Sequence, residues 1–494
     1  MIIDKIKEAN VFIKNNKYRI NSEYRLNYHL MGEYGWINDP NGFVFYKGKY
    51  HLFYQNYPYK ACVGPMHWGH AVSVDLIKWN YLPIALAPDR DFDKDGCFSG
   101  TSIIVDGNLC ILYTGHICTG KSKEEYKQVQ NYAYSEDGIN FEKYSGNPVL
   151  DTNEIHGEAS TKDIRDPKVF KLEKDYYMIL GSIDNFGNGE VLLYKSLDLI
   201  KWEYVNVLAK GNSDMGKVWE CPDIFNLDGK DILIVSPQYM KKEGLNYHNL
   251  HSSIYILGKL NTEKGEFIFK DYYPVDYGFD FYAPETIEDP KGRRIIVAWM
   301  DMWETEMPTS TQGHNWTGAM TLPREMFFNN GKLCFKPIEE IKDYRRNEFS
   351  LENILLKDEI ELDAIGDSYE IVVTFKPIEA SDFGIKLRVG NDEETILTYD
   401  TENNLFTFNR DKSGKGPKGK RSTEVYLTQN ELELRIFVDK SSVEVFINHG
   451  QKTMTARIYP SALSNKIKLF SKGECKVVTF HKWDIKENEV HKKI

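Results

Sequence analysis

Apolar residues recur in paired runs along the first two thirds of the chain. Each pair consists of a short apolar run, a tight polar or glycine-containing turn and a second apolar run, and the five pairs span residues 43–54, 101–113, 168–180, 224–235 and 286–299. The pairs follow one another with a period of about sixty residues, and repeated units of strand, turn and strand are typical of propeller blades. The pattern therefore predicts a five-bladed β-propeller over residues 25–338.

The rest of the chain follows different patterns. Apolar residues at helical spacing in 3–14 predict a short amphipathic helix, packed on the outside of the propeller within an N-terminal extension of residues 1–24. Residues 339–349 read as a short helical linker. Beyond them the repeat ends and short strands alternate with polar turns, as in 369–375 and 443–447, which predicts a β-sandwich over 350–494. The expected fold class is all-β.

Composition narrows the choice of partners. The formal net charge is −11, which argues against nucleic acids and anionic membranes as partners. The chain contains no apolar run of eighteen residues, and its first residues lack the apolar core of a signal peptide, so we expect a cytoplasmic protein. The seven cysteines show no metal-ligand spacing, so we expect neither a metal nor a cofactor. Nothing in the pattern predicts an oligomeric state.

Three acidic residues occupy the same place in their repeats. Asp39, Asp166 and Glu220 each lie at the entry to the first strand of a repeat. Because equivalent positions in a propeller surround one axis, we expect the three carboxyl groups to converge at one end of the central channel. Cleavage of a glycosidic bond requires two carboxyl groups, and a third can hold sugar hydroxyls in position. The arrangement predicts a glycoside hydrolase.

The motifs around these acids resemble those of a known family. Residues 36–42 (WINDPNG), 165–167 (RDP) and 220–222 (ECP) occur in the order of the three signature motifs of glycoside hydrolase family 32, which includes invertases, sucrose-6-phosphate hydrolases, inulinases and levanases. Further matches extend the resemblance from about residue 24 to residue 484; they lie at Gln55, 67–71, 98–100, 281–285, 318–325 and 437–446.

The resemblance implies a retaining mechanism with a role for each acid. Asp39 would be the nucleophile that forms a fructosyl-enzyme intermediate, Glu220 the general acid/base, and Asp166 the stabiliser of the transition state. It also implies a set of sugar contacts: Trp36, Asn38, Gln55, Trp68, Phe98, Ser99, Arg165, Tyr282 and Trp299. Trp68 and Trp299 can stack on sugar faces, and the alternative for each is packing within the propeller. Cys221 is either a neighbour that tunes Glu220 or a small buried filler.

The expected substrate is a small sugar. A cytoplasmic enzyme of this family would meet sucrose, sucrose 6-phosphate or short fructo-oligosaccharides, so we expect a β-fructofuranosidase that hydrolyses sucrose or sucrose 6-phosphate. A fructosyltransferase or a fructan hydrolase of the same family is an alternative. More remote alternatives are an inverting propeller hydrolase acting on arabinan or xylan and a non-catalytic sugar-binding protein.

Overall fold

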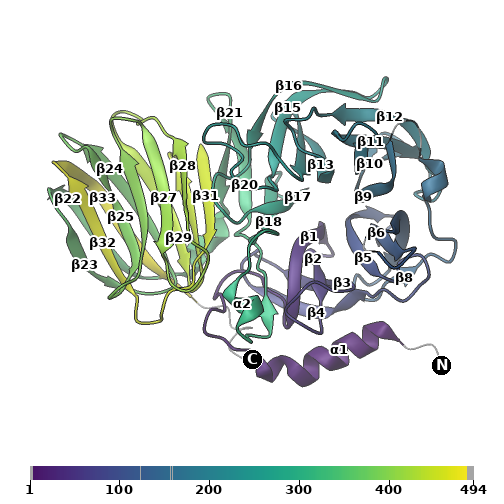
Figure 1. Cartoon of the computed structure of the whole chain (residues 1–494), viewed down its shortest axis with the longest axis horizontal. Helices are drawn as coiled ribbons and strands as arrows, with labels where there is room; N and C mark the ends of the chain where they lie inside the picture. The colour runs from purple at the N-terminus through teal and green to yellow at the C-terminus, as the bar shows by residue number, and fades with distance from the viewer. Residues whose placement is uncertain (1–3, 123, 156, 158, 487–494) are drawn as a thin grey trace.

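The computed structural model describes residues 4–122, 124–155, 157 and 159–486. Five small sheets make up the N-terminal part, and two six-stranded sheets make up the C-terminal part (Figure 1). The first strands of the five small sheets contact one another in a closed ring, in the order β1, β5, β9, β13, β17 and back to β1. The chain is thus a five-bladed β-propeller followed by a β-sandwich, as its sequence predicts.

Each blade is an antiparallel sheet that follows the chain outward from the channel. The blades consist of β1 (Gly35–Tyr46), β2 (Lys49–Tyr57), β3 (His67–Ser73) and β4 (Trp79–Leu86); β5 (Gly96–Val105), β6 (Asn108–Cys118), β7 (Tyr126–Ser135) and β8 (Glu142–Lys143); β9 (Ala159–Leu172), β10 (Asp175–Asp184), β11 (Gly189–Ser196) and β12 (Glu203–Lys210); β13 (Trp219–Leu227), β14 (Lys230–Pro237), β15 (Ile254–Asn261) and β16 (Glu266–Pro274); and β17 (Tyr282–Glu288), β18 (Arg294–Trp299), β20 (Arg324–Asn329) and β21 (Lys332–Pro337). The short strand β19 (Trp316–Thr317), from the last blade's connections, pairs in parallel with β1 and so ties the last blade to the first.

Helix α1 (Lys5–Asn16) lies against the outside of the first blade (Figure 1). It begins where the side chain of Asp4 accepts a hydrogen bond of 3.0 Å from the backbone nitrogen of Lys7, an N-cap that satisfies a free helical donor. Its apolar face buries Ala9 and Ile13, and the helix packs on β4. The expected helix over 3–14 has its first residue outside the described part of the chain. The other helices among the described residues are short: η1 (Lys17–Arg19), η2 (Thr152–Glu154), α2 (Pro308–Thr311) and η3 (Glu339–Tyr344).

The sandwich consists of two sheets that enclose one apolar core. In spatial order one sheet contains β22 (Arg345–Leu356), β33 (Cys475–Ile485), β24 (Tyr369–Pro377), β29 (Leu432–Asp439), β30 (Ser442–Ile447) and β31 (Lys452–Arg457), and the other contains β23 (Ile360–Ile365), β32 (Lys466–Lys472), β25 (Asp382–Val389), β26 (Glu394–Asp400), β27 (Leu405–Lys412) and β28 (Lys420–Glu424). Strand β22 begins five residues before the expected start of the sandwich, because Arg345 pairs with Ile485 of the last strand.

A buried ionic network joins the sandwich to the propeller. The two ring nitrogens of His29, which precedes the first blade, each lie 2.9 Å from a sandwich carboxylate, Nδ1 from Asp439 and Nε2 from Glu444. Arg324 of β20 donates to Glu444 at 2.5 Å and to Asp276 at 2.9 Å. All five side chains are almost wholly excluded from solvent. Since buried charges are tolerated only when paired, this network fixes how the two parts dock.

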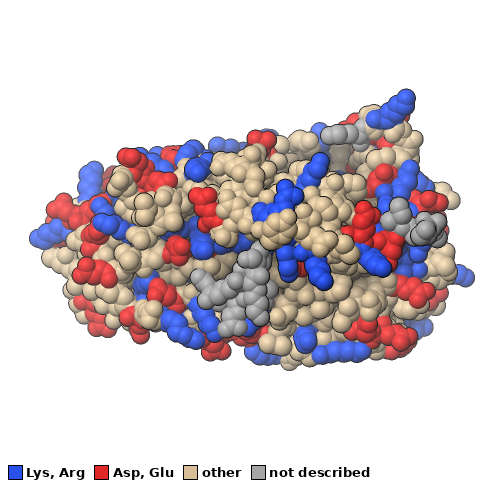
Figure 2. Space-filling model, turned by 90° about the horizontal axis from the view of Figure 1, so that it is seen from below, with Lys and Arg blue, Asp and Glu red and all other residues tan. Residues whose placement is uncertain are grey.

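The surface carries charges of both signs. Figure 2 shows basic and acidic side chains interspersed over one face of the molecule, without an extended area of one sign. Within the described residues, every helix falls short of the length and hydropathy that crossing a membrane requires.

Candidate active site

The motifs singled out in the sequence lie at irregularities in the innermost strands. In β9, β13 and β17 a residue with positive φ directly precedes a proline: Asp166 (φ 59°), Cys221 (φ 48°) and Ala283 (φ 50°). The pairing register with the second strand of the blade shifts at the same places. Proline cannot donate to a strand ladder, and a bulge changes the direction in which side chains leave the strand. The repeated bulges therefore explain why one end of the channel receives side chains from several blades.

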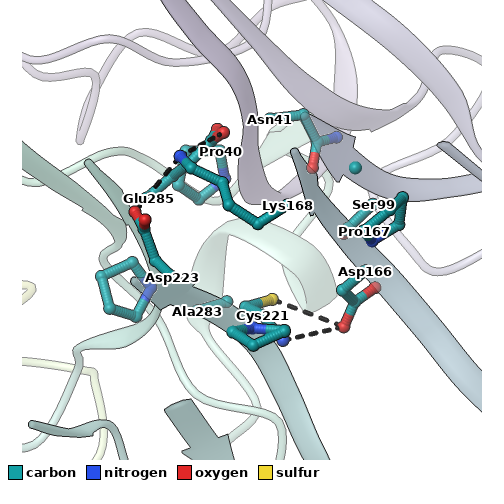
Figure 3. Close-up of a pocket in the computed structure, with 13 residues that line it drawn as sticks. Pro40, Asn41, Ser99, Asp166, Pro167, Lys168, Cys221, Asp223, Ala283 and Glu285 are labelled. Carbon is teal, nitrogen blue, oxygen red and sulfur yellow. Dashed lines mark hydrogen bonds and ion pairs between the residues drawn. The ribbon is translucent and has the colours of Figure 1, made fainter. Parts of the chain in front are cut away.

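The acidic residues meet around Cys221. The sulfur of Cys221 lies 3.8 Å from Asp39 Oδ2 and 3.6 Å from Asp166 Oδ2. Its backbone nitrogen also donates to Asp166 Oδ2 at 3.0 Å, a contact visible in Figure 3. Glu220 directly precedes Cys221 and accepts a hydrogen bond of 3.0 Å from Arg165, the residue before Asp166. Carboxyl groups that are far apart in the sequence thus share one site, as the phase of the repeat predicts.

Asp39 is held by two donors. The hydroxyl of Ser99 donates to Oδ2 at 2.8 Å, and the amide of Asn38 donates to Oδ1 at 3.0 Å. The indole nitrogen of Trp36 donates to Asn38 Oδ1 at 2.8 Å, which fixes the orientation of that amide. The pKa of Asp39 is raised to about 6, mainly by burial and to a smaller extent by the negative charge of Glu220. The hydrogen bonds from Asn38 and Ser99 lower this pKa. Asp39 is therefore mostly ionised at neutral pH.

Glu220 accepts hydrogen bonds at both carboxylate oxygens. Oε1 accepts from Arg165 at 3.0 Å and from Gln238 at 2.9 Å, and Oε2 accepts from the hydroxyl of Tyr282 at 2.6 Å. Burial, followed by the charge of Glu220, raises the pKa of Tyr282 well above its ordinary value, so this phenol stays a donor. The sequence analysis does not predict a role for Gln238. The pairing of the strands explains its position, because Glu220 pairs with Ser236 of β14 and Gln238 follows directly after that strand.

Asp166 and Arg165 form the third part of the site. The backbone nitrogen of Asp166 donates to Thr114 at 3.0 Å, and buried Arg165 also donates to Gln128 and Asp163, each at 3.0 Å. Burial and the charge of Glu220 raise the pKa of Asp166 to about 7, against the effect of Arg165. Burial opposes the charged form of Arg165, but the neighbouring carboxylates, Glu220 foremost, raise its pKa above the ordinary value. Arg165 thus places a permanent cation directly beside Glu220 and Asp166.

The tryptophans near the acids differ in their exposure to solvent. Trp36 stacks on Trp303, with ring centroids 5.8 Å apart, and Trp303 is 39% exposed although nothing in the sequence singled it out. The stacking faces expected at Trp68 and Trp299 are absent, because both indoles are 0% exposed. Trp68 instead packs in the first two blades and donates to the carbonyl oxygen of Phe98 at 3.0 Å.

Phe98 and Gln55 are also expected to contact sugar. Phe98 stacks on His116 with centroids 4.5 Å apart. Gln55 is buried on β2, where it pairs with Trp68 of β3 across the strand ladder. The structure thus brings Asn38, Ser99, Arg165 and Tyr282 into direct contact with the acids.

Both parts of the chain match one family of enzymes. Residues 29–337 match the glycosyl hydrolases family 32 N-terminal domain, and residues 340–487 match the glycosyl hydrolases family 32 C-terminal domain. The two matched segments correspond to the propeller and the sandwich.

Individual relatives cover nearly the whole chain. A sucrose-6-phosphate hydrolase of Zymomonas mobilis is 37% identical over 98% of this chain and 96% of its own length, and a raffinose invertase of Escherichia coli is 38% identical over 90% and 91%. Among solved structures, a Bombyx mori GH32 beta-fructofuranosidase in complex with sucrose superposes with a TM-score of 0.86, at 34% identity, over 98% of both chains. The chain belongs to glycoside hydrolase family 32.

Proposed function

We propose that this chain is a retaining β-fructofuranosidase that hydrolyses sucrose or sucrose 6-phosphate through a fructosyl-enzyme intermediate. The observation that carries the proposal is the meeting of Asp39, Asp166 and Glu220 at one end of the channel, each with a different set of partners. Two relatives that cover 98% and 90% of this chain are named sucrose-6-phosphate hydrolase and raffinose invertase, and these names support the same substrate class.

Asp39 is the proposed nucleophile. A carboxylate that attacks the anomeric carbon must be ionised and must present a fixed oxygen. The bonds from Ser99 and Asn38 hold the group in one orientation and stabilise its charge. With a pKa of about 6, Asp39 is ionised at neutral pH yet remains more basic, and so more nucleophilic, than an exposed aspartate.

Glu220 is the proposed acid/base. It would protonate the oxygen of the leaving glucosyl group and then take a proton from the water that hydrolyses the intermediate. Arg165, Gln238 and Tyr282 hold its carboxyl group on three sides. This restraint suits a group that has to meet the leaving oxygen and the incoming water in one place.

Asp166 is the proposed stabiliser of the transition state. Its carboxylate, adjacent to the cation of Arg165, would accept hydrogen bonds from hydroxyls of the fructosyl ring. Such bonds hold the ring in register with Asp39, and they strengthen as positive charge develops at the anomeric carbon.

Related reactions use the same intermediate. A fructosyltransferase differs only in passing the fructosyl group to a sugar instead of water, and a fructan hydrolase differs in the leaving group. Product profiles at high sucrose concentration distinguish transfer from hydrolysis. The values of kcat/KM for sucrose, sucrose 6-phosphate and kestose rank the leaving groups.

The decisive experiment compares wild type with Glu220→Gln in a reducing-sugar assay on sucrose. The substitution keeps the size of the side chain but removes its acid, so kcat is expected to fall by about 10²–10⁴-fold. Glu203→Gln is the matched control, because Glu203 is exposed on β12 at the outer edge of its blade. Equal sugar release from wild type and Glu220→Gln would refute the assignment. Retention is checked by NMR of the fructose anomer released first.

A further inference from the structure

A second cluster of charges lies in the channel beyond the acids. Lys168, Asp223 and Glu285 make up this channel cluster: the ammonium nitrogen of Lys168 lies 3.2 Å from Asp223 Oδ2 and 3.3 Å from Glu285 Oε1. Figure 3 shows the three side chains grouped on one side of the view, with Asp166 and Cys221 on the other. Lys168 follows Asp166 by two residues, and Asp223 follows Glu220 by three. Lys168 and Asp223 therefore lie on strands that carry two of the acids, and Glu285 lies on the neighbouring β17.

Its hydrogen bonds connect four of the five innermost strands. Glu285 of β17 uses its second oxygen to accept from the backbone nitrogen of Phe43 in β1, at 3.0 Å. Lys168 of β9 donates to the carbonyl oxygen of Thr286 at 3.0 Å, and Asp223 of β13 accepts from the nitrogen and the hydroxyl of Thr286, both at 2.8 Å. Strands β1, β9, β13 and β17 are thus joined through one lysine and two carboxylates.

The channel cluster lies between two cavities. A cavity of about 20 Å³, room for about one water molecule, is lined by Asp166 and Cys221 on one side and by the channel cluster on the other. A larger cavity of about 690 Å³ lies further along the channel, and Lys168 and Asp223 line it too. Apolar side chains such as Phe43 and Ile287 pack between neighbouring blades, whereas open space adjoins the channel cluster along the channel. The charged side chains of the channel cluster therefore add contacts between strands across this space.

The charge balance shows that the channel cluster is costly to bury. Burial raises the pKa of Glu285 to about 7 although Lys168 acts against it. Burial also opposes the charge of Lys168, but Asp223 and Glu285 raise its pKa, while Arg294 of β18 acts in the other direction. Replacing buried ion pairs by apolar residues is often neutral or stabilising, so stability alone does not account for this arrangement.

We propose that Lys168, Asp223 and Glu285 are positioning residues, which hold the innermost strands at the spacing that lets Asp39, Asp166 and Glu220 act on one fructosyl carbon. The channel cluster acts through the strands and not through the sugar. Lys168 sets the place of Asp166, Asp223 that of Glu220, and Glu285 that of the β1 segment after Asp39. The inference rests on the proposed hydrolysis.

The test measures kcat and KM for sucrose in Lys168→Met, which keeps an unbranched side chain, one atom shorter, and removes the ammonium group and its charge. Small misplacements of catalytic groups are costly, so kcat per folded molecule is expected to fall by about tenfold to a hundredfold, with KM changed by less than about threefold. The folded fraction is measured by circular dichroism at the assay temperature. Lys171→Met is the matched control, because Lys171 is an exposed lysine three residues further along β9.

Two results would overturn the inference. One is a kcat of Lys168→Met, corrected for the folded fraction, within about twofold of wild type; the other is a loss confined to KM. If Lys168→Met does not fold, kcat and KM of Glu285→Gln are measured and judged by the same limits. The glutamine oxygen can still accept the hydrogen bond from Phe43, but the side chain no longer forms an ion pair with Lys168. Wild type inactive on every fructoside would refute the proposed hydrolysis instead, whereas an active wild type with an equally active Lys168→Met refutes only the positioning role.

Discussion

Replacement of His29 by phenylalanine should destabilise the chain in a pH-dependent way. A neutral imidazole can donate from only one ring nitrogen, yet both nitrogens of His29 lie 2.9 Å from a carboxylate. Burial alone would lower the pKa of His29, but the hydrogen bonds and charges of Asp439 and Glu444 raise it above the ordinary value. His29 is therefore an imidazolium that joins the propeller to the sandwich, and phenylalanine keeps a ring there without either donor.

The size of the effect follows from the two hydrogen bonds that His29 donates. A hydrogen bond to a charged group contributes about 1.5–3 kcal/mol, so two contribute about 3–6 kcal/mol. Asp439 keeps the backbone nitrogens of Asn27 and Tyr28 as donors, and Glu444 keeps Arg324. Because these partners remain, we expect a loss of stability at the lower end of this range, about 3 kcal/mol. If the whole chain unfolds in one transition, with an unfolding entropy of about 2.1 cal/mol/K per residue, this loss lowers Tm by about 3 °C.

The dependence on pH has a definite sign. Because the pKa of His29 is raised on folding, its contribution is complete below about pH 6.5, the ordinary value, and is lost as pH rises through the folded-state value. His29 and Arg324 lower the pKa values of Asp439 and Glu444 against their burial, so the contribution of the carboxylates is present above about pH 4.5 and is lost in acid. The substitution should therefore be most costly between these limits. The cost should decline above about pH 6.5, by at most about 1.4 kcal/mol per pH unit.

Urea denaturation of the full chain near pH 5.5 and pH 8.5 measures this difference. The matched control is His481→Phe, because His481 pairs with Glu348 at 2.9 Å but is 30% exposed and can keep its stacking on Trp483. An ion pair of that kind contributes less than about 1 kcal/mol. If His29→Phe costs no more than His481→Phe, or costs the same at both pH values, His29 is not a buried imidazolium that stabilises the fold.

Two further predictions concern the active site. Burial raises the pKa of Asp39 and the hydroxyl of Ser99 lowers it, so Ser99→Ala should raise this pKa further. The acidic limb of the pH profile of kcat/KM on sucrose should therefore move to higher pH. An unmoved limb would contradict the role of Asp39 as an ionised nucleophile. Tyr282→Phe removes the bond of 2.6 Å to Glu220, so kcat should fall by about tenfold to a hundredfold, the equivalent of about 1.5–3 kcal/mol; a change in KM alone would show that this tyrosine binds sugar without orienting Glu220.

The blades were predictable because each of their hairpins is local. The two strands of a pair such as 43–54 or 224–235 are adjacent in sequence and joined by a tight turn, so alternation and turn residues suffice to identify them. Their repetition at a constant period then implied a ring, and the ring implied that Asp39, Asp166 and Glu220 share one end of the channel. The convergence of the acids could be inferred before any contact was known.

The surroundings of the acids depended on contacts between strands of different blades. Tryptophan has the same intrinsic preferences at 68, 299 and 303, and only the packing of neighbouring blades decided that the first two are buried and the third is exposed. Gln238 reaches Glu220 because of the register of β13 and β14.

The sequence by itself determined the repeat, the position of the acids within it and the family. Only the tertiary structure decided which side chains are exposed and which charges face one another, including the channel cluster, whose members come from three blades, and the pairing of His29 with carboxylates more than four hundred residues away. The physical reason is that strand formation depends on residues near in sequence, whereas burial and the ionisation of buried groups depend on whatever the completed fold places beside them.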